Sequence, residues 1–136
     1  MTQMISPEMH YLFWAIVLGL VQLLLAILSN VSGHGTGWAL GPRDDGRPAL
    51  PKYRGRIERA WFNFVETFPF FAAAVLAASA LNMQSATTAL GAALYFWARV
   101  AYVPAYVISI PLLRTLIWLV SLAGIVIILC GLWPGW

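Results

Sequence analysis

The chain has 136 residues, enough for one domain, and its composition is far from that of a water-soluble protein. Hydrophobic residues make up 61% and charged residues 10%, whereas soluble domains average roughly 45–50% and about 25%. The net charge of +3 comes mainly from one loop that also contains acidic residues, so we expect membrane lipid rather than nucleic acid as a partner. The single cysteine, Cys130, excludes an intrachain disulfide and a multi-cysteine metal site.

The N-terminal third of the chain contains a long uncharged segment. No Asp, Glu, Lys or Arg occurs between Met9 and Pro42. A helix needs about 20 residues to cross a bilayer, so this segment predicts a membrane helix over residues 9–31. The residues before it lack the basic region of a signal peptide, which indicates that this helix is retained. Prolines, a glycine and paired aspartates then predict a loop over about residues 32–55.

Three further apolar runs predict three more membrane helices, over residues 56–81, 86–109 and 112–132. A short polar break at 82–85 separates the first two runs, and Pro111 marks the turn before the last. We therefore expect an all-α integral membrane protein, a four-transmembrane-helix bundle that forms a single domain over residues 1–136.

The cations outside the apolar runs predict how the bundle is oriented. The turn at 82–85 and the two terminal segments contain no Lys or Arg. Because cytoplasmic loops are enriched in these residues, we expect the first loop in the cytoplasm and both termini outside it. The cations on the expected cytoplasmic side are Arg43, Arg47, Lys52, Arg54, Arg56 and Arg114.

Polar residues recur along one face of the second and of the third expected helix. Arg59, Asn63 and Glu66 are spaced i, i+4 and i+7, which places them on one stripe. Hydrocarbon cannot satisfy polar groups, so the stripes must face protein. The third helix has a stripe of the same kind, formed by Tyr95, Arg99, Tyr102 and Tyr106.

The two stripes can meet at one depth in the membrane. A rise of about 1.5 Å per residue places Glu66 and Arg99 roughly 14 Å and 16 Å from the cytoplasmic ends of their helices. We expect an ion pair there, at the floor of a polar slot whose mouth lies near Arg59, Tyr106 and Arg114. Two interpretations stay open. The pair could be an interhelical clamp, or the whole set could bind a small zwitterionic or anionic ligand, because arginine binds carboxylates and a carboxylate can hold an ammonium group.

These residues resemble the signature of a known family. The run from Arg59 to Phe70 resembles the second helix of the MAPEG family, the membrane-associated proteins in eicosanoid and glutathione metabolism. The run from Ala98 to Tyr106 is similar to the third helix of that family. The pair Arg114-Thr115 resembles the step that opens its fourth helix. The resemblance covers about residues 56–130.

The resemblance implies a homotrimer that binds glutathione as a co-substrate between adjacent subunits, near the cytoplasmic face. It further implies a glutathione-dependent transferase or peroxidase acting on lipophilic electrophiles. We expect no metal site, because His10 and His34 lie near opposite ends of the first helix. Arg114 would be the catalytic residue, because a cation beside the sulfur stabilises the thiolate. The residues assigned to glutathione binding are Arg59, Asn63, Glu66, Arg99, Tyr102 and Tyr106.

The chain also departs from the family pattern. Some members have a basic or polar residue just before the asparagine, where this chain has Trp61 and Phe62, and further cations where this chain has only Arg114. Arg43 or Arg47 of the first loop is a candidate to complete a neighbouring site. These departures keep an alternative open, a non-catalytic MAPEG-fold lipid-binding protein or an accessory subunit of a membrane complex. The short chain indicates a bacterial inner membrane rather than an endoplasmic reticulum.

Overall fold

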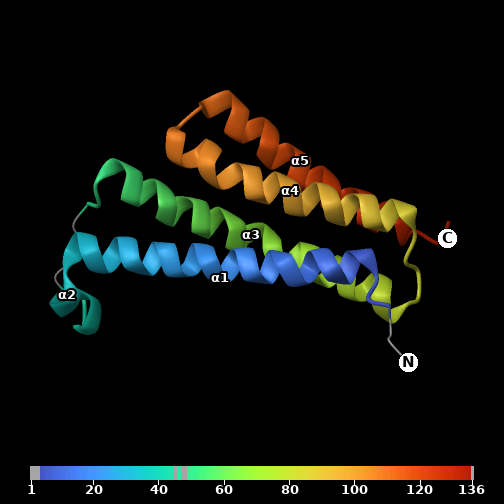
Figure 1. The fold of residues 1–136 in the computed structure, drawn as a ribbon, viewed down its shortest axis with the longest axis horizontal. Helices are drawn as coiled ribbons and strands as arrows, with labels where there is room; N and C mark the ends of the chain where they lie inside the picture. The colour runs from blue at the N-terminus through green and yellow to red at the C-terminus, as the bar shows by residue number, and fades with distance from the viewer. Residues whose placement is uncertain (1–3, 45, 47–48, 136) are drawn as a thin grey trace.

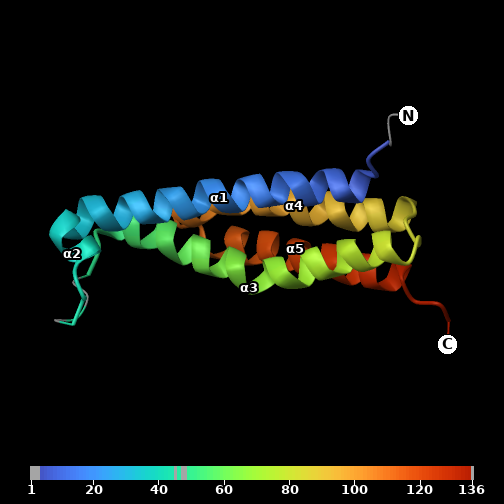
Figure 2. The same cartoon turned by 90° about the horizontal axis from the view of Figure 1, so that it is seen from below.

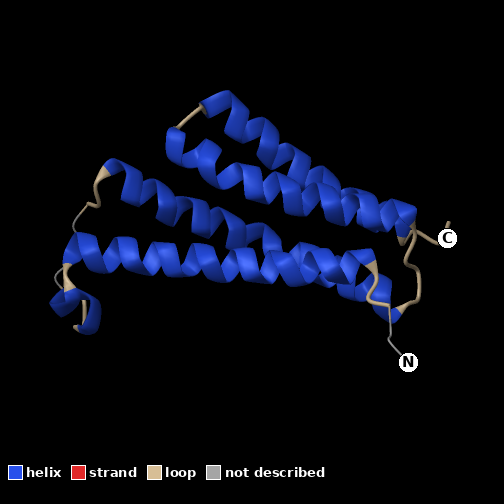
Figure 3. Ribbon diagram, in the orientation of Figure 1, coloured by secondary structure: helices blue, strands red, loops and turns tan. Residues whose placement is uncertain are grey.

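The fold is known from a computed structural model that describes residues 4–44, 46 and 49–135. All regular structure in these residues is helical (Figure 3). Four long helices run along the bundle, and a short one lies at one end of it (Figure 1). The five helices are α1 (Pro7–His34), α2 (Thr36–Leu40), α3 (Lys52–Ala80), α4 (Ala86–Ile108) and α5 (Pro111–Gly131).

The two chain termini lie at the same end of the bundle, as Figures 1 and 2 show from two sides. The other end carries α2 and the turn between α4 and α5 (Figure 1). We call it the basic end, because Arg43, Lys52, Arg54, Arg56 and Arg114 all lie in or beside these segments. An arrangement with both termini at one end requires an even number of passes along the bundle.

Among the described residues, three helices are long and apolar enough to cross a membrane: α1, α3 and α5. The chain is therefore a membrane protein. Helix α4 has 23 residues, but it contains Arg99 and three tyrosines and is not among these three helices. Whether α4 also crosses the membrane depends on how its polar residues are covered.

Capping residues define where the helices begin. Ser6 caps α1, since its hydroxyl accepts a hydrogen bond from the backbone N–H of Met9 at 3.3 Å. Ser85 and Thr88 form a reciprocal capping box at the start of α4. Pro111 occupies the first turn of α5, where its missing N–H removes no helical hydrogen bond.

The segment between α1 and α3 is more ordered than the loop expected over residues 32–55. Helix α1 continues to His34, and the short helix α2 follows directly. Helix α3 begins at Lys52 instead of residue 56. Gly35 separates the two helices, and a tilted contact between the rings of His34 and Trp38, with centroids 4.4 Å apart, ties α2 to the end of α1.

The hairpin of α4 and α5 is held by contact between two backbones. A Cβ atom built on Gly91 would lie 2.5 Å from the carbonyl oxygen of Gly124, and one built on Gly124 would lie 2.6 Å from that of Gly91. Only glycine fits at both positions. Next to this contact, Tyr95 of α4 stacks on Phe71 of α3 with centroids 4.0 Å apart, and both rings are fully buried.

A buried carboxylate joins α1 to α4 at the end that carries the termini. Glu8 is 1% exposed, and its Oε1 accepts a hydrogen bond from the hydroxyl of Thr88 at 2.5 Å. Each residue lies in the first turn of its helix, where the helix dipole favours a negative charge. The contact fixes the start of α4 against the start of α1.

Candidate functional site

The centre of the polar region is the guanidinium of Arg99, which is buried between α4 and α3. The residue is 1% exposed. Its Nη1 donates to Oδ1 of Asn63 at 2.8 Å, and its Nη2 donates to the backbone oxygen of Asn63 at 2.9 Å and to the hydroxyl of Thr67. The two helices are therefore joined by one cation that makes three hydrogen bonds.

Thr67 is a member of this cluster that the sequence analysis did not identify. Its hydroxyl oxygen lies 3.1 Å from the hydroxyl of Tyr95, so it connects Arg99 to a second residue of α4. The ring of Tyr102 covers the cation from another side, with its centroid 5.1 Å from the guanidinium carbon. The sequence contained a signal for this residue. Thr67 follows Asn63 by one helical turn, so the two side chains lie on the same face of α3.

The prediction that Arg99 pairs with Glu66 is wrong for the single chain. Within the described residues, the guanidinium is bound by Asn63 and Thr67, and the side chain of Glu66 is exposed. The reason is angular. Successive residues of a helix are turned by about 100°, so Thr67 lies about 40° to one side of Asn63 and Glu66 about 60° to the other. Helix α4 packs against the side that carries Thr67.

Three residues of the predicted site converge on the hydroxyl and ring of Tyr106 near the basic end. The Nε of Arg59 donates to the Tyr106 hydroxyl at 3.2 Å. The guanidinium carbon of Arg114 lies 5.1 Å from the centroid of the same ring. The ring centroid of Tyr102 lies 5.5 Å from that of Tyr106. Helices α3, α4 and α5 thus each contribute a side chain to one group.

Arg56 supports this end of the site although the sequence analysis counted it only as a loop cation. Its Nη1 donates to the backbone oxygen of Val107 at 3.0 Å. Val107 lies in the last turn of α4, whose carbonyl groups have no helical partner and attract cations. The contact fixes the end of α4 against α3, and Tyr106 is the neighbouring residue.

The set is accessible from outside the chain at the basic end. Arg59 and Glu66 are exposed, and Tyr106 and Arg114 are partly exposed. A single chain therefore presents an open, mainly positive surface with one carboxylate rather than a closed pocket. The loop arginines are not part of this surface as described. Arg43 contacts α2, with its guanidinium 4.8 Å from the ring of Trp38, and Arg47 lies outside the described residues.

The arrangement has the chemistry of a site for a small charged ligand. Exposed guanidinium groups bind carboxylates in a bidentate manner, a carboxylate can bind an ammonium group, and phenol hydroxyls can donate to an anion. Within the described residues, no group of three or more His, Cys, Asp or Glu side chains could hold a metal ion. The site residues supply cations, one carboxylate and hydrogen-bond donors.

A comparison with known protein families agrees with these residues. The model of the MAPEG family matches residues 11–133, which include all four long helices in large part and every residue of the site. A comparison with curated proteins found no significant match. Since the family match covers most of its length, the chain belongs to the MAPEG family.

Proposed function

We propose that the protein is a glutathione-dependent membrane transferase or peroxidase that acts on lipophilic electrophiles. The family is associated with glutathione and eicosanoid metabolism in membranes. The observation that carries the proposal is the convergence of Arg59 and Arg114 on Tyr106. It places two cations and a phenol hydroxyl at one point of an accessible surface, as the binding and ionisation of an acidic thiol peptide require.

The charged ends of glutathione would bind to α3. Arg59 donates only its Nε to Tyr106, and its terminal nitrogens form a fork that suits a carboxylate. Glu66 would bind the ammonium group. Asn63 is oriented for binding, because its oxygen accepts from Arg99 and its amide N–H groups are thereby directed away from that cation. In this proposal Arg99 is a positioning residue that holds Asn63, since it is too deeply buried to contact the ligand.

Arg114 would act on the sulfur. A fixed cation close to the thiol favours the thiolate, and at about 4 Å it supplies about 4 kcal/mol of attraction at an effective dielectric constant near 20. The thiolate then attacks an electrophilic carbon, a C–S bond forms, and the leaving group departs with its electron pair. With a hydroperoxide the thiolate attacks the terminal oxygen, the O–O bond breaks, and the alcohol leaves. The sulfur becomes a sulfenic acid, which a second glutathione converts to glutathione disulfide with release of water.

The same proposal includes the assembly. We propose four membrane spans, a homotrimer, and an inner membrane of a bacterium with both termini outside the cytoplasm. The position of both termini at one end supports four passes (Figure 2). The hydrogen bonds of Arg99 and the burial of Tyr95 and Tyr102 cover the polar face of α4. The exposure of Arg59 and Glu66 supports a neighbouring subunit that closes the site.

A second candidate is supported by the departures in sequence. Trp61 and Phe62 replace polar residues that some family members have, and Arg114 is the only cation after Tyr106. A non-catalytic protein that binds lipid or serves as an accessory subunit would keep the fold and lose such residues. It predicts a protein that does not ionise glutathione.

The test is the ultraviolet difference spectrum of glutathione added to the purified protein, with S-methylglutathione as the control that cannot ionise. We expect a thiolate band for wild type. The band should be lost in Arg114→Ala, while calorimetry still detects bound glutathione. A wild-type protein that binds glutathione without the band would contradict the role of Arg114, and one that does not bind glutathione at all would favour the second candidate.

A further inference from the structure

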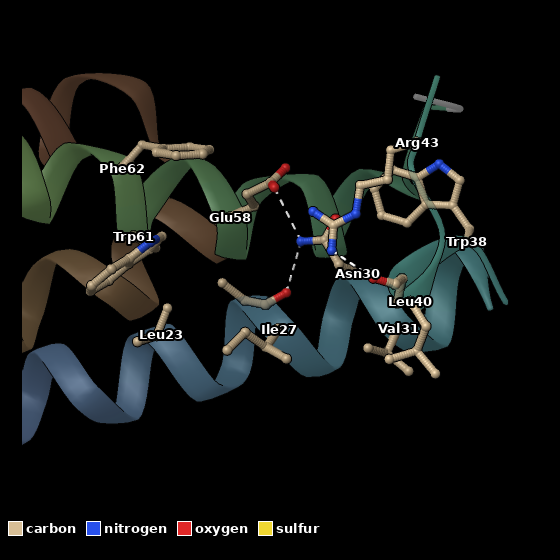
Figure 4. Close-up of a pocket in the computed structure, with 12 residues that line it drawn as sticks. Leu23, Ile27, Asn30, Val31, Trp38, Leu40, Arg43, Glu58, Trp61 and Phe62 are labelled. Carbon is tan, nitrogen blue, oxygen red and sulfur yellow. Dashed lines mark hydrogen bonds between the residues drawn. The ribbon is translucent and has the colours of Figure 1, made fainter. Parts of the chain in front are cut away.

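Hollows at the two ends of the bundle are lined by different polar groups. The one at the basic end has a volume of about 710 Å³ and lies between α1, α2 and α3. Its polar side chains are engaged with the protein, because Asn30 donates to Glu58 and Arg43 donates to the backbone oxygen of Ala39 (Figure 4). A site for an added ligand is better supported at the other end, where the termini lie.

The hollow at that end has a volume of about 530 Å³ and lies between the start of α1, the end of α3 and the turn after it. Two thioethers and an imidazole line it, those of Met4, Met9 and His10. Methionine sulfur and imidazole nitrogen are both metal ligands. The other lining residues are Ile5, Ser6, Phe13, Ser79 and Gln84. One stretch of chain, residues 4–10, therefore brings three potential ligands to one hollow.

We expected no metal site from the sequence, because the two histidines lie near opposite ends of the first helix. The structure gives His10 methionines as neighbours instead of a second histidine. Clusters of His, Cys, Asp and Glu are missing from the described residues, but that set of ligands does not include thioethers. The expectation holds for hard and intermediate metal ions and leaves soft ones open.

Hydrogen bonds hold the segment before α1 beside the hollow. The hydroxyl of Ser6 accepts from the backbone N–H of Met9 at 3.3 Å and from Nε2 of Gln84 at 2.9 Å. The second bond ties this segment to the turn between α3 and α4. Met9 packs against the hydrophobic core, whereas Met4 is 95% exposed. One thioether is therefore fixed by α1, and the other can adjust to a ligand from an anchored segment.

The composition of the hollow favours a soft, monovalent cation. The first 42 residues contain no Lys or Arg, so no side-chain cation of this segment opposes a bound one. Thioethers are neutral and polarisable, and they select Cu(I). Zn²⁺ is bound instead by thiolates, imidazoles and carboxylates, and no thiolate or carboxylate is among the described residues that line the hollow.

His10 has a partner that a metal ion would displace. Its Nε2 accepts a hydrogen bond from the indole Nε1 of Trp14 at 3.1 Å. A metal at Nε2 would take the lone pair that accepts this bond. A metal at Nδ1 would leave the proton on Nε2, which could then no longer accept. Ligation by either nitrogen of His10 therefore releases the indole of Trp14.

We propose that Met4, Met9 and His10 form a binding site for one Cu(I) ion at the end of the bundle that carries the termini. Two sulfurs and one imidazole nitrogen give a neutral, three-coordinate set of ligands. The proposed glutathione site lies toward the basic end, so the copper site depends neither on glutathione nor on a neighbouring subunit.

The test is Cu(I) binding to the full-length Cys130→Ala protein, purified without a polyhistidine tag and without glutathione. The substitution removes an exposed thiol that would itself bind Cu(I). Anaerobic competition with the chromophoric chelator bicinchoninate should give one Cu(I) per chain, and an equal concentration of Zn²⁺ should not displace it. In NMR spectra of protein with ¹³C-labelled methionine methyl groups, Cu(I) should shift the signals of Met4 and Met9 and leave that of Met83 unchanged.

Matched variants locate the ligands. Met4→Leu, Met9→Leu and His10→Gln should each weaken Cu(I) binding by about tenfold or more, and leucine replaces methionine with little change in volume. Met83→Leu and His34→Gln are the controls, because they remove the same ligand atoms from residues that do not line the hollow. Both controls should bind Cu(I) as the parent protein does.

Trp14→Phe tests the role of the imidazole in the opposite direction. It removes the hydrogen bond that competes with the metal for His10. Cu(I) binding should therefore become about two- to tenfold tighter, which is the effect of losing one competing hydrogen bond.

The inference is overturned if the Cys130→Ala protein binds no Cu(I), or if Met4→Leu and Met9→Leu bind it as tightly as the parent. Displacement by an equal concentration of Zn²⁺ would contradict a thioether site. A Trp14→Phe protein that binds no more tightly would show that His10 is not a ligand. Since glutathione is absent from every measurement, none of these outcomes bears on the proposed transferase or peroxidase activity.

Discussion

The two ends of α4 are held in different ways. At the end that carries the termini, Gly91 and Gly124 bring the backbones of α4 and α5 into contact, and a single added carbon would collide with a carbonyl oxygen. At the basic end, α4 is joined to its neighbours through long side chains, chiefly Arg99 to Asn63 and Arg59 to Tyr106. Figure 1 shows the hairpin of α4 and α5 diverging from α1 toward that end.

The two kinds of contact differ in what they leave accessible. Backbone contact leaves no room between helices, so it fixes a position and excludes ligands. The side-chain contacts at the basic end join the helices as well, and there Arg59 is exposed and Arg114 is partly exposed. The glycine contact at the end that carries the termini fixes α4 against α5. The side-chain contacts at the basic end then hold Arg59 and Arg114 at fixed distances from Tyr106.

The largest effect is expected from removing a charge at the basic end. Arg114→Ala should lower the rate of glutathione conjugation to a lipophilic electrophile by about 100-fold, which is the loss typical of one group that stabilises developing or localised negative charge. Binding of glutathione should change little, because Arg59 and Glu66 remain. Steady-state kinetics with a model aryl halide measures this, and Arg54→Ala is the control for general loss of positive charge. A mere change in KM would contradict a role in the chemical step.

A somewhat smaller effect is expected from adding one carbon at the end that carries the termini. In Gly124→Ala the new Cβ would lie 2.6 Å from a backbone oxygen, and the helices must move apart at a cost of about 1–3 kcal/mol. Thermal unfolding in detergent should detect this. Gly37→Ala is the matched control, since nothing lies within 4 Å of its Cβ position. Equal stability of the two variants would argue against backbone contact.

A smaller loss of stability is expected from removing the hydroxyl of Thr67, which contacts residues at the centre of α4. Thr67→Val keeps the shape and removes the partner shared by Arg99 and Tyr95. A buried donor left without a partner costs about 1–3 kcal/mol, so thermal stability should fall by an amount near the lower end of that range. Thr115→Val is the control, because the hydroxyl of Thr115 is exposed and bonds only within its own helix. If both substitutions are equally mild, the cluster does not hold the helices together.

The smallest effect on stability is expected at the surface. Tyr106→Phe removes the exposed hydrogen bond from Arg59, which contributes about 0.5–1.5 kcal/mol at most. Tyr53→Phe removes a chemically identical bond from Arg54 at 3.0 Å that lies outside the site. The two variants should therefore have similar stability, and only Tyr106→Phe should weaken glutathione binding in calorimetry. A similar loss of binding in both would mean that Tyr106 has no special role.

Several features of the molecule could be predicted from the sequence because they depend on local patterns. The apolar runs gave the four long helices to within a few residues at most ends. The estimated depths along the helices placed Arg59, Tyr106 and Arg114 together, and the structure brings Arg59 and Arg114 into contact with Tyr106. That these residues bind glutathione remains a prediction.

Other features depend on which side of a stripe faces the neighbouring helix, and spacing alone does not determine this. Glu66 and Thr67 are both within about 60° of Asn63 on α3, so either could have met Arg99. The contact between Glu8 and Thr88 joins residues 80 positions apart. It could not be read from either local sequence, because each residue by itself is an ordinary member of a first helical turn.

The burial of Arg99 has a consequence for how the protein is made. An arginine at the centre of a membrane helix raises the free energy of insertion by about 2.5–3.5 kcal/mol. In the four-span arrangement proposed above, Arg99 gives α4 this cost, and α4 is the long helix that is not among those apolar enough by themselves to cross a membrane. Its partners Asn63 and Thr67 belong to α3, which leaves the ribosome first. We expect α3 to act as the template on which α4 enters the bilayer, so the order of the helices along the chain is itself a requirement. A circular permutant in which α4 and α5 precede α3 should show poor insertion of α4 in a glycosylation-mapping assay, although its final set of contacts would be the same.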